Sequence, residues 1–288
     1  MKKSVISSLL AASALILLAG CSSSPTPSPT SPTTLKPSLI STPPSSPSAT
    51  SAVVTKAYAQ YWVADTAKGI RLYREYVRLQ VTPDPIITSL RALIGGKPKD
   101  SDYFSLWPKE TRINSVTVTG SLATIDLTLG KMNLGSEAES MAIAQLVWTA
   151  TAANTTVKRI QLTVDGKIVE SIAGHVDATK PFKRASSSEV LAPVWIISPE
   201  EGAQVSATGF TLKGMASTFE ANVAWKVFKD GKLVQQGSTL TAGAAPSWKP
   251  WSVSLPGLLP GQYTFIAMEF SARDGSLVAQ DTKNATLL

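Results

Sequence analysis

The chain is poor in the side chains that perform most catalysis and metal binding. Its 288 residues include one cysteine, Cys21, and one histidine, His175. A single cysteine excludes an intramolecular disulfide, and a single histidine excludes a zinc site built on two or three histidines. The sequence also lacks a glycine-rich phosphate loop and a Gly-x-Ser-x-Gly nucleophile elbow. We therefore expect no metal, no cofactor and no catalytic residue, so that the protein is not an enzyme.

The carboxylates that lie close together in the sequence are badly spaced for catalysis. Asp100 and Asp102 share a loop, and Glu200 and Glu201 are adjacent, whereas a glycosidase needs two carboxyl groups that face each other across a cleft. We predict that both pairs lie in solvated turns, and that His175, in the polar stretch GHVDATKPF, is structural or exposed. A hydrolase that uses carboxylates is the function with the least support.

The single cysteine lies at the end of a secretory signal. Two lysines precede the apolar residues 4–18, and Leu-Ala-Gly brings small residues up to Cys21. This order predicts a signal peptide over residues 1–20, because the apolar run is shorter than the roughly 20 residues that span a bilayer.

Leu-Ala-Gly-Cys also resembles the bacterial lipobox. The resemblance implies cleavage before Cys21, a diacylglyceryl thioether on its sulfur, and a further acyl chain such as palmitate on the new amino terminus. More than one buried chain anchors a protein stably, since each buried methylene contributes about 0.8 kcal/mol. We expect an extracytoplasmic protein, lipid-anchored to the cell membrane.

Residues 21–54 continue from this cysteine as a tether. Between residues 22 and 50, 24 of 29 side chains are Ser, Thr or Pro, which leaves too little apolar surface to offset chain entropy. The prolines favour extended polyproline II. We predict a disordered spacer that reaches on the order of 90 Å.

Positive charge is concentrated in one half of the remaining chain. Residues 55–184 carry 17 basic and 12 acidic side chains, whereas residues 192–288 carry seven of each. Outside a cell, anionic lipid or wall polymer are plausible partners of a basic surface. No dense basic run is interleaved with aromatic residues, so we expect no nucleic-acid partner. The alternative is a mildly basic surface that is simply solvated.

Residues 55–184 show two helices between β-hairpins. Asp84 and a proline at the next position predict the start of one helix, which we expect a left-handed Gly95 to end. Ser136 and Glu139 predict a capping box for the second helix. The order β-β-α-β-β-α-β-β favours an α+β domain, with two helices packed on a mostly antiparallel sheet.

This region resembles the GerMN domain, named after a sporulation and germination lipoprotein. The matching stretches are WPKETRINSVTV, LATIDLTL and EAESMAIAQLVWTATAANTTVKRIQLTVDGK, with Asp165-Gly166 at the family's late hairpin. These motifs are turns and core positions, which are specific for a fold and nearly silent about chemistry. Relatives have been linked to ring-forming scaffolds of envelope machines, so the resemblance implies self-association or partner docking.

After a linker at residues 185–191, helical periodicity disappears. Residues 192–288 hold about seven short strand-like runs separated by turns, which predicts an all-β immunoglobulin-like sandwich. The runs VWIISPEEG and GMASTFEANVAWKVFKDGKLV resemble the Gmad-type immunoglobulin-like domain of spore-germination proteins.

Four side chains of this second unit are candidates for binding. Trp248 and Trp251 lie in a Pro-Ser-Trp-Lys-Pro-Trp loop, and exposed tryptophans can stack on sugar rings. The alternative for both is packing in the sandwich core. Phe219 and Glu220 are either a surface contact, or a buried phenylalanine beside a carboxylate that accepts backbone hydrogen bonds.

These features together predict a non-enzymatic, membrane-anchored envelope lipoprotein related to spore-germination and sporulation lipoproteins. Its partner is expected to be an envelope protein or a cell-wall polymer. The alternative is an extracytoplasmic sensor of a glycan or small ligand, or an accessory to a transporter.

Overall fold

The computed structural model describes residues 53–288, so Cys21 and the signal peptide predicted at residues 1–20 lie outside the described residues. Within residues 53–288, no helix has both the length and the apolar character needed to cross a bilayer.

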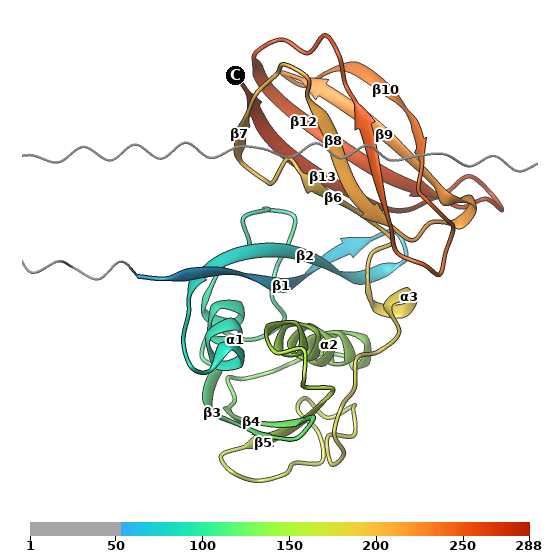
Figure 1. Ribbon diagram of the computed structural model, residues 1–288. Helices are drawn as coiled ribbons and strands as arrows, with labels where there is room; N and C mark the ends of the chain where they lie inside the picture. Colours follow the sequence, from blue (N-terminus) through green and yellow to red (C-terminus); the bar gives the residue numbers. More distant parts are fainter. Residues whose placement is uncertain (1–52) are drawn as a thin grey trace, which may run out of the picture. The chain divides into compact units, whose positions relative to one another are not determined.

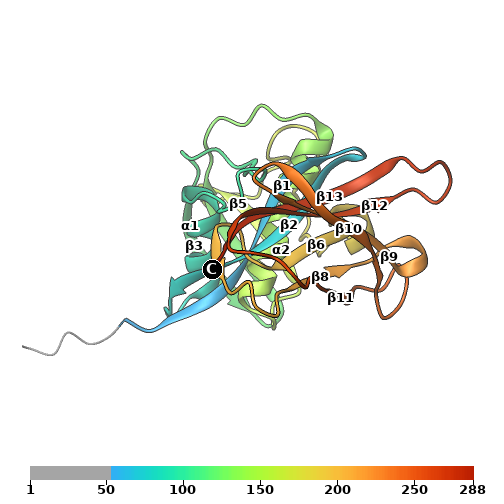
Figure 2. The ribbon, with the colours of Figure 1, turned by 90° about the horizontal axis from the view of Figure 1, so that it is seen from above.

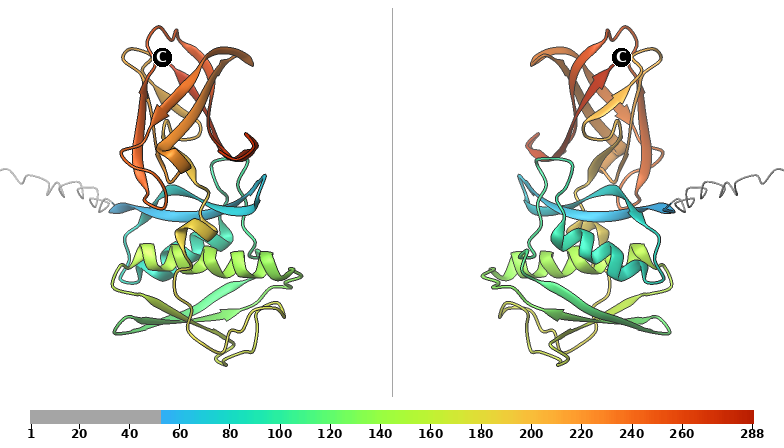
Figure 3. Two further views of the ribbon diagram at one scale, coloured as in Figure 1. Left: turned by 90° about the vertical axis from the view of Figure 1, so that its right-hand side faces the viewer. Right: turned by 90° about the vertical axis from the view of Figure 1, so that its left-hand side faces the viewer.

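The N-terminal domain holds its two long helices between two small sheets (Figures 1 and 3). In chain order its elements are β1 (Thr55–Thr66), β2 (Gly69–Gln80), α1 (Pro85–Gly95), β3 (Arg112–Thr119), β4 (Leu122–Thr128), α2 (Ser136–Ala153) and β5 (Arg159–Val164). β1 and β2 form an antiparallel hairpin on one side of the helices, and β3, β4 and β5 form a sheet on the other side.

Helix α1 begins as the sequence predicts. The backbone N–H of Ile87 donates to Asp84 Oδ1 at 2.9 Å, and Pro85 occupies the first turn. Its end differs from the prediction, because Gly95 stays helical and the capping residue Gly96 is extended rather than left-handed. The N–H of Gly96 still bonds to the carbonyl of Ala92 at 3.0 Å, so the helix ends without a left-handed residue.

The capping box predicted for α2 is absent. The capping residue is Gly135, which makes no side-chain hydrogen bond, and Ser136 is already the first helical residue. Glu139 turns away from the helix start and accepts hydrogen bonds from residues 171–175. Residues 141–150 of α2 are all buried, because the helix has sheet on both sides.

The second sheet is less antiparallel than predicted. β4 pairs antiparallel with β3, but β5 runs parallel to β4, because α2 carries the chain back to the same end of the sheet, as in a βαβ unit. The last of the six predicted strands is missing. After the Asp165-Gly166 turn only the Val164–Lys167 bridge forms, and Phe182 pairs with Ile160 on β5 instead.

The C-terminal domain is a sandwich of two sheets (Figures 1 and 2). A short helix, α3 (Ser187–Val190), precedes it. Its elements are β6 (Val194–Ser198), β7 (Ala203–Val205), β8 (Thr211–Ala216), the 3-10 turn η1 (Phe219–Ala221), β9 (Asn222–Lys229), β10 (Lys232–Leu240), β11 (Lys249–Ser254), β12 (Gly261–Phe270) and β13 (Leu277–Leu287). One sheet has the order β10-β9-β12-β13-β7 and the other β11-β8-β6.

Alternate residues of β9 contribute to the core of this sandwich. Val223 and Val227 on β9 are fully buried, and Trp225 between them is partly buried against the same cluster. The short β7, which pairs parallel with β13, is an element that the sequence pattern missed.

Backbone bonds continue across the junction of the two domains. Leu191 bridges Leu72 on β2, and the N–H of Ala192 donates to the carbonyl of Leu72 at 3.0 Å. Trp195 on β6 is buried in the core cluster of the N-terminal domain. The described residues 53–288 accordingly form one compact unit.

Candidate functional site

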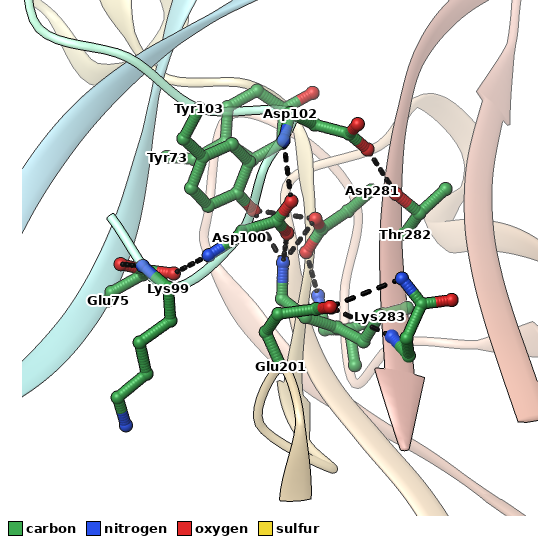
Figure 4. Close-up of polar contacts among 12 residues, drawn as sticks. Tyr73, Glu75, Lys99, Asp100, Asp102, Tyr103, Glu201, Asp281, Thr282 and Lys283 are labelled. Carbon is green, nitrogen blue, oxygen red and sulfur yellow. Dashed lines mark hydrogen bonds and ion pairs between the residues drawn. The ribbon is translucent and has the colours of Figure 1, made fainter. Parts of the chain in front are cut away.

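A buried ionic cluster joins the two domains (Figure 4). Lys283 on β13 is 4% exposed. Its ammonium group donates to Asp100 of the N-terminal domain, to Tyr103 Oη at 2.7 Å and to Asp281 Oδ1 at 2.8 Å. Three acceptors satisfy the three N–H donors of the lysine, so the charge is buried without an unpaired donor.

Asp281, which lies on β13 with Lys283, bonds to both domains. Its Oδ1 also accepts from Tyr103 Oη at 2.6 Å, and its Oδ2 accepts from the N–H of Ile196 on β6 at 2.6 Å. Beside it, Tyr73 on β2 donates to the carbonyl of Gln280 at 2.6 Å. Two tyrosines of the N-terminal domain therefore bond directly to β13.

A second layer of contacts holds the loop that carries Asp100. Glu75 on β2 accepts from the backbone N–H groups of Lys99 and Asp100, at 3.0 and 2.9 Å. At the rim, Lys99 Nζ pairs with Glu200 Oε2 at 2.8 Å, and Asp102 accepts from the hydroxyl of Thr282. The loop is thus fixed from both domains.

Burial and neighbouring charges shift the protonation of this cluster. Burial alone would lower the pKa of Lys283, but Asp281 and Asp100 outweigh it and raise that pKa. Burial raises the pKa of Asp281, and the nearby Lys283 only partly opposes this. Burial also raises the pKa of Tyr103 well above its usual value. At neutral pH, Lys283 is therefore an ammonium ion and Tyr103 a neutral phenol.

The prediction that Asp100 and Asp102 lie in a solvated turn is wrong for Asp100, which is 2% exposed. The C-terminal domain covers Asp100, and the sequence around Asp100 contains no local pattern that predicts a contact with another domain. Glu200 and Glu201 do lie near the surface, and Glu201 accepts from the backbone and side chain of Asn284. The sequence signal that was missed is on β13, where Asp281 and Lys283 lie on the inward face of the strand, between two buried alanines.

A groove lies at the other end of the junction. It encloses about 310 Å³, whereas the hollow beside the ionic cluster encloses only about 50 Å³. Its walls are the β1–β2 turn with Lys68 and Arg71, the α3 segment, and the C-terminal domain around Trp248 and Glu269. Residues from three separate parts of the chain therefore converge on it.

Hydrogen bonds hold these walls in place. Thr66 Oγ1 donates to the carbonyl of Gly69 at 2.6 Å and closes the hairpin turn. The N–H of Ala245 donates to the carbonyl of Thr218 at 2.9 Å, and the N–H of Ser217 donates to the carbonyl of Pro193 at 2.8 Å.

The two candidate tryptophans have different positions. Trp248 lines the groove, is partly exposed, and packs on Trp195 with ring centroids 4.4 Å apart. Trp251 is 3% exposed in the sandwich core. Its ring lies against Gly214 of β8, where a Cβ would come within 2.3 Å of the ring. Only Trp248 has a face available to a ligand.

Phe219 and Glu220 form an exposed turn near the groove. Phe219 is 61% exposed and Glu220 is exposed as well, so the expectation of a buried phenylalanine is wrong. The carboxylate that accepts a backbone hydrogen bond here is Glu269, whose Oε1 bonds the N–H of Phe219 at 3.0 Å. Glu269 also lines the groove and was not among the four candidate binding residues.

Glu139 and the loop before His175 form a further polar site within the N-terminal domain. Burial would raise the pKa of Glu139, but hydrogen bonds from Ala173, Ser171, His175 and Ile172 lower it. The side chain of His175 is exposed, and only its backbone N–H takes part. Among the described residues, no group of three His, Cys, Asp or Glu side chains is placed to hold a metal ion.

Two family models match the chain. Residues 59–170 match Germane, described as sporulation and spore germination. Residues 193–276 match Gmad2, described as an immunoglobulin-like domain of bacterial spore germination. The chain carries a Germane (GerMN) domain followed by a Gmad2 domain. The resemblance of both regions is thereby confirmed, and the Gmad2 match covers β6 to β12 of the sandwich.

Solved structures add related proteins at low identity. The tandem GerMN domains of the sporulation protein GerM from Bacillus subtilis are 20% identical, with 50% of this chain and 51% of that chain covered and a TM-score of 0.40. A provisionally described lipoprotein from Clostridium perfringens is 22% identical, with 45% and 88% covered and a TM-score of 0.33. These scores are low, so the assignment rests on the family models. No curated protein matches the chain.

Proposed function

We propose that the chain is a non-enzymatic lipoprotein of the cell envelope, anchored through Cys21, that docks to another envelope component with its GerMN and Gmad2 domains held as one unit. The observation that carries the proposal is the ionic cluster of Lys283, Asp100 and Asp281 across the domain junction. Burying charges is expensive, and fixing one arrangement of the parts is the best-attested benefit.

The chemistry of the two domains supports docking over catalysis. The buried carboxylates Asp100, Asp281 and Glu139 all accept hydrogen bonds from structural donors. Two of the large exposed apolar side chains, Phe219 at 61% and Leu240 at 69% exposure, lie on the turn before β9 and at the end of the neighbouring edge strand β10 of the Gmad2 domain. Exposed apolar groups of this kind are typical of contact surfaces.

Site-specific photo-crosslinking in living cells tests this function. A photoreactive amino acid at Phe219 or Leu240 should give discrete adducts with an envelope protein or with wall material. The same label at Lys131, which is exposed on the GerMN domain, reports chance contacts. Adducts no more abundant at Phe219 and Leu240 than at Lys131 would contradict docking through this surface. Release of soluble fragments from peptidoglycan, abolished by one carboxylate substitution, would contradict the non-enzymatic role.

The groove beside Trp248 supports a second candidate function, in which the protein senses a glycan or small ligand. This candidate differs from the first in that recognition takes place inside a preformed cavity at the domain junction.

A further inference from the structure

We propose that the groove between the β1–β2 turn and Trp248 binds a saccharide that carries a carboxylate group. This inference rests on the proposed docking function and names the chemical class of one component to which the protein docks. The two observations behind it are a partly exposed aromatic ring and a set of unpaired charges that face the same space.

The groove has the size and rigidity of a binding site. Its volume of about 310 Å³ falls at the lower end of the range for ligand pockets, roughly 300 to 1,000 Å³. Trp248 is held by its contact with Trp195, and the bond between Ala245 and Thr218 holds the loop before it. A ligand would therefore enter without much ordering of the protein, which reduces the cost of binding.

Trp248 provides the apolar surface. Its ring contacts Trp195, in the core cluster of the GerMN domain, with the two ring planes tilted by 39°, while the residue as a whole stays partly exposed and lines the groove. A partly exposed aromatic ring held in this way suits the apolar face of a pyranose ring.

Lys68 and Arg71 provide positive charge on the opposite wall. Within residues 53–288, neither side chain forms an ion pair. Arg71 Nη1 donates to the carbonyl of Ile70 at 2.7 Å, which leaves most of its N–H donors for another group. Planar guanidinium groups bind carboxylates in a paired geometry that a lone ammonium does not offer.

Glu269 and nearby serines provide partners for hydroxyl groups. Glu269 Oε1 accepts from Phe219, and burial raises the pKa of this carboxyl. Ser187, Ser188 and Ser217 also line the groove. Sugar hydroxyls both donate and accept, so a mixture of carboxylate and hydroxyl groups suits them.

This combination selects among ligand classes. A polyphosphate would place several negative charges beside Glu269, and a neutral glycan would leave Lys68 and Arg71 without a partner. A saccharide with one carboxylate would stack on Trp248 and pair its carboxylate with Lys68 and Arg71. The β-1,4-linked disaccharide of N-acetylglucosamine and N-acetylmuramic acid is a probe with this chemistry.

Calorimetric titration of the lipidated protein in detergent micelles tests the proposal. The acidic disaccharide should bind at least tenfold more tightly than neutral chitobiose, which corresponds to about 1.4 kcal/mol. The double variant Lys68→Gln/Arg71→Gln should lose this preference and bind both sugars equally. Trp248→Ala should weaken both by about tenfold or more. Lys232→Gln, an exposed lysine on β10, is the control and should bind as the native protein does.

Three outcomes would overturn the inference. They are equal binding of the acidic and neutral sugars by the native protein, binding of a free stem peptide in place of both sugars, and no binding of any probe at low millimolar concentration. If the sugars fail while crosslinks at Phe219 persist, the groove proposal falls and the docking function stands. If the sugars bind and no crosslinks form, docking through the surface around Phe219 falls, and the groove stands as a saccharide site.

Discussion

At the scale of single residues, Lys283 is the side chain on which the contact between the two domains most depends. Removing one partner of a buried ionic group leaves the remaining charges uncompensated, which typically costs about 3–5 kcal/mol. We expect Lys283→Met to lower the free energy of unfolding by about this amount at neutral pH, as measured by urea denaturation. The loss should shrink in acid, because Asp281, whose pKa burial raises, then takes up a proton.

Lys99→Met is the matched control for this substitution. Its partner Glu200 is also acidic, but both side chains are about half exposed, and such pairs contribute under about 1 kcal/mol. Equal losses for the two lysine variants would mean that the buried cluster has no special role.

Glu139 gives a prediction with a definite pH dependence. Its pKa is lowered, so it contributes stability above its unfolded pKa of about 4.3, and this contribution is lost as the pH falls through the folded pKa. Glu139→Gln should destabilise the protein by about 1–3 kcal/mol at neutral pH, and the gap to the native protein should narrow in acid.

Glu137→Gln serves as the comparison for this variant. Glu137 lies in the same first turn of α2 but is exposed, so we expect a loss of about 0.3–1 kcal/mol from the helix dipole alone. A Glu139→Gln variant no less stable than Glu137→Gln would show that the four hydrogen bonds contribute little.

The sequence predicted the buried ionic cluster less well than it predicted the two domain families. Asp281 and Lys283 occupy inward positions of a strand whose alternation is clear in the sequence, and two charged residues on a core face are a readable signal of a buried ion pair. The identity of their partners was not readable, because Asp100 and Tyr103 lie about 180 positions away. Contacts at that distance in the chain exist only once both domains are folded.

At the scale of elements, the two long helices start in different ways. α1 has a side-chain cap from Asp84, whereas α2 has none. We expect Asp84→Ala to cost about 1 kcal/mol, and Ser136→Ala to cost much less, because Ser136 is inside the helix. Thermal unfolding of both variants measures the difference, and a larger loss for Ser136→Ala would restore the capping box that the structure lacks.

The elements that sequence patterns predict well are those with strong local signals. The start of α1 is an example, since the side chain of Asp84 and the proline at the next position determine it locally. The direction of β5 was predicted wrongly because α2 determines it. The last of the six predicted strands does not form, because Ser171 and its neighbours bond to Glu139 instead of to β5.

At the scale of the whole molecule, the lipid anchor has a direct test. Cys21→Ala removes the only sulfur that could carry the diacylglyceryl group, so the protein should leave the membrane fraction or accumulate as uncleaved precursor. Cell fractionation with mass spectrometry of the amino terminus measures both. A mature, membrane-bound Cys21→Ala protein would contradict the anchor.

The central claim is that the GerMN and Gmad2 domains keep one orientation. Because Cys21 is expected to be lipidated, the double variant Thr117→Cys/Ser238→Cys would place two free thiols, one on exposed β3 and one on exposed β10. The most direct test is the distribution of distances between spin labels on these thiols, measured by pulsed electron spin resonance. A single narrow distance that broadens when Lys283→Met is added is the predicted result, and a broad distribution in the protein with Lys283 intact would contradict the claim.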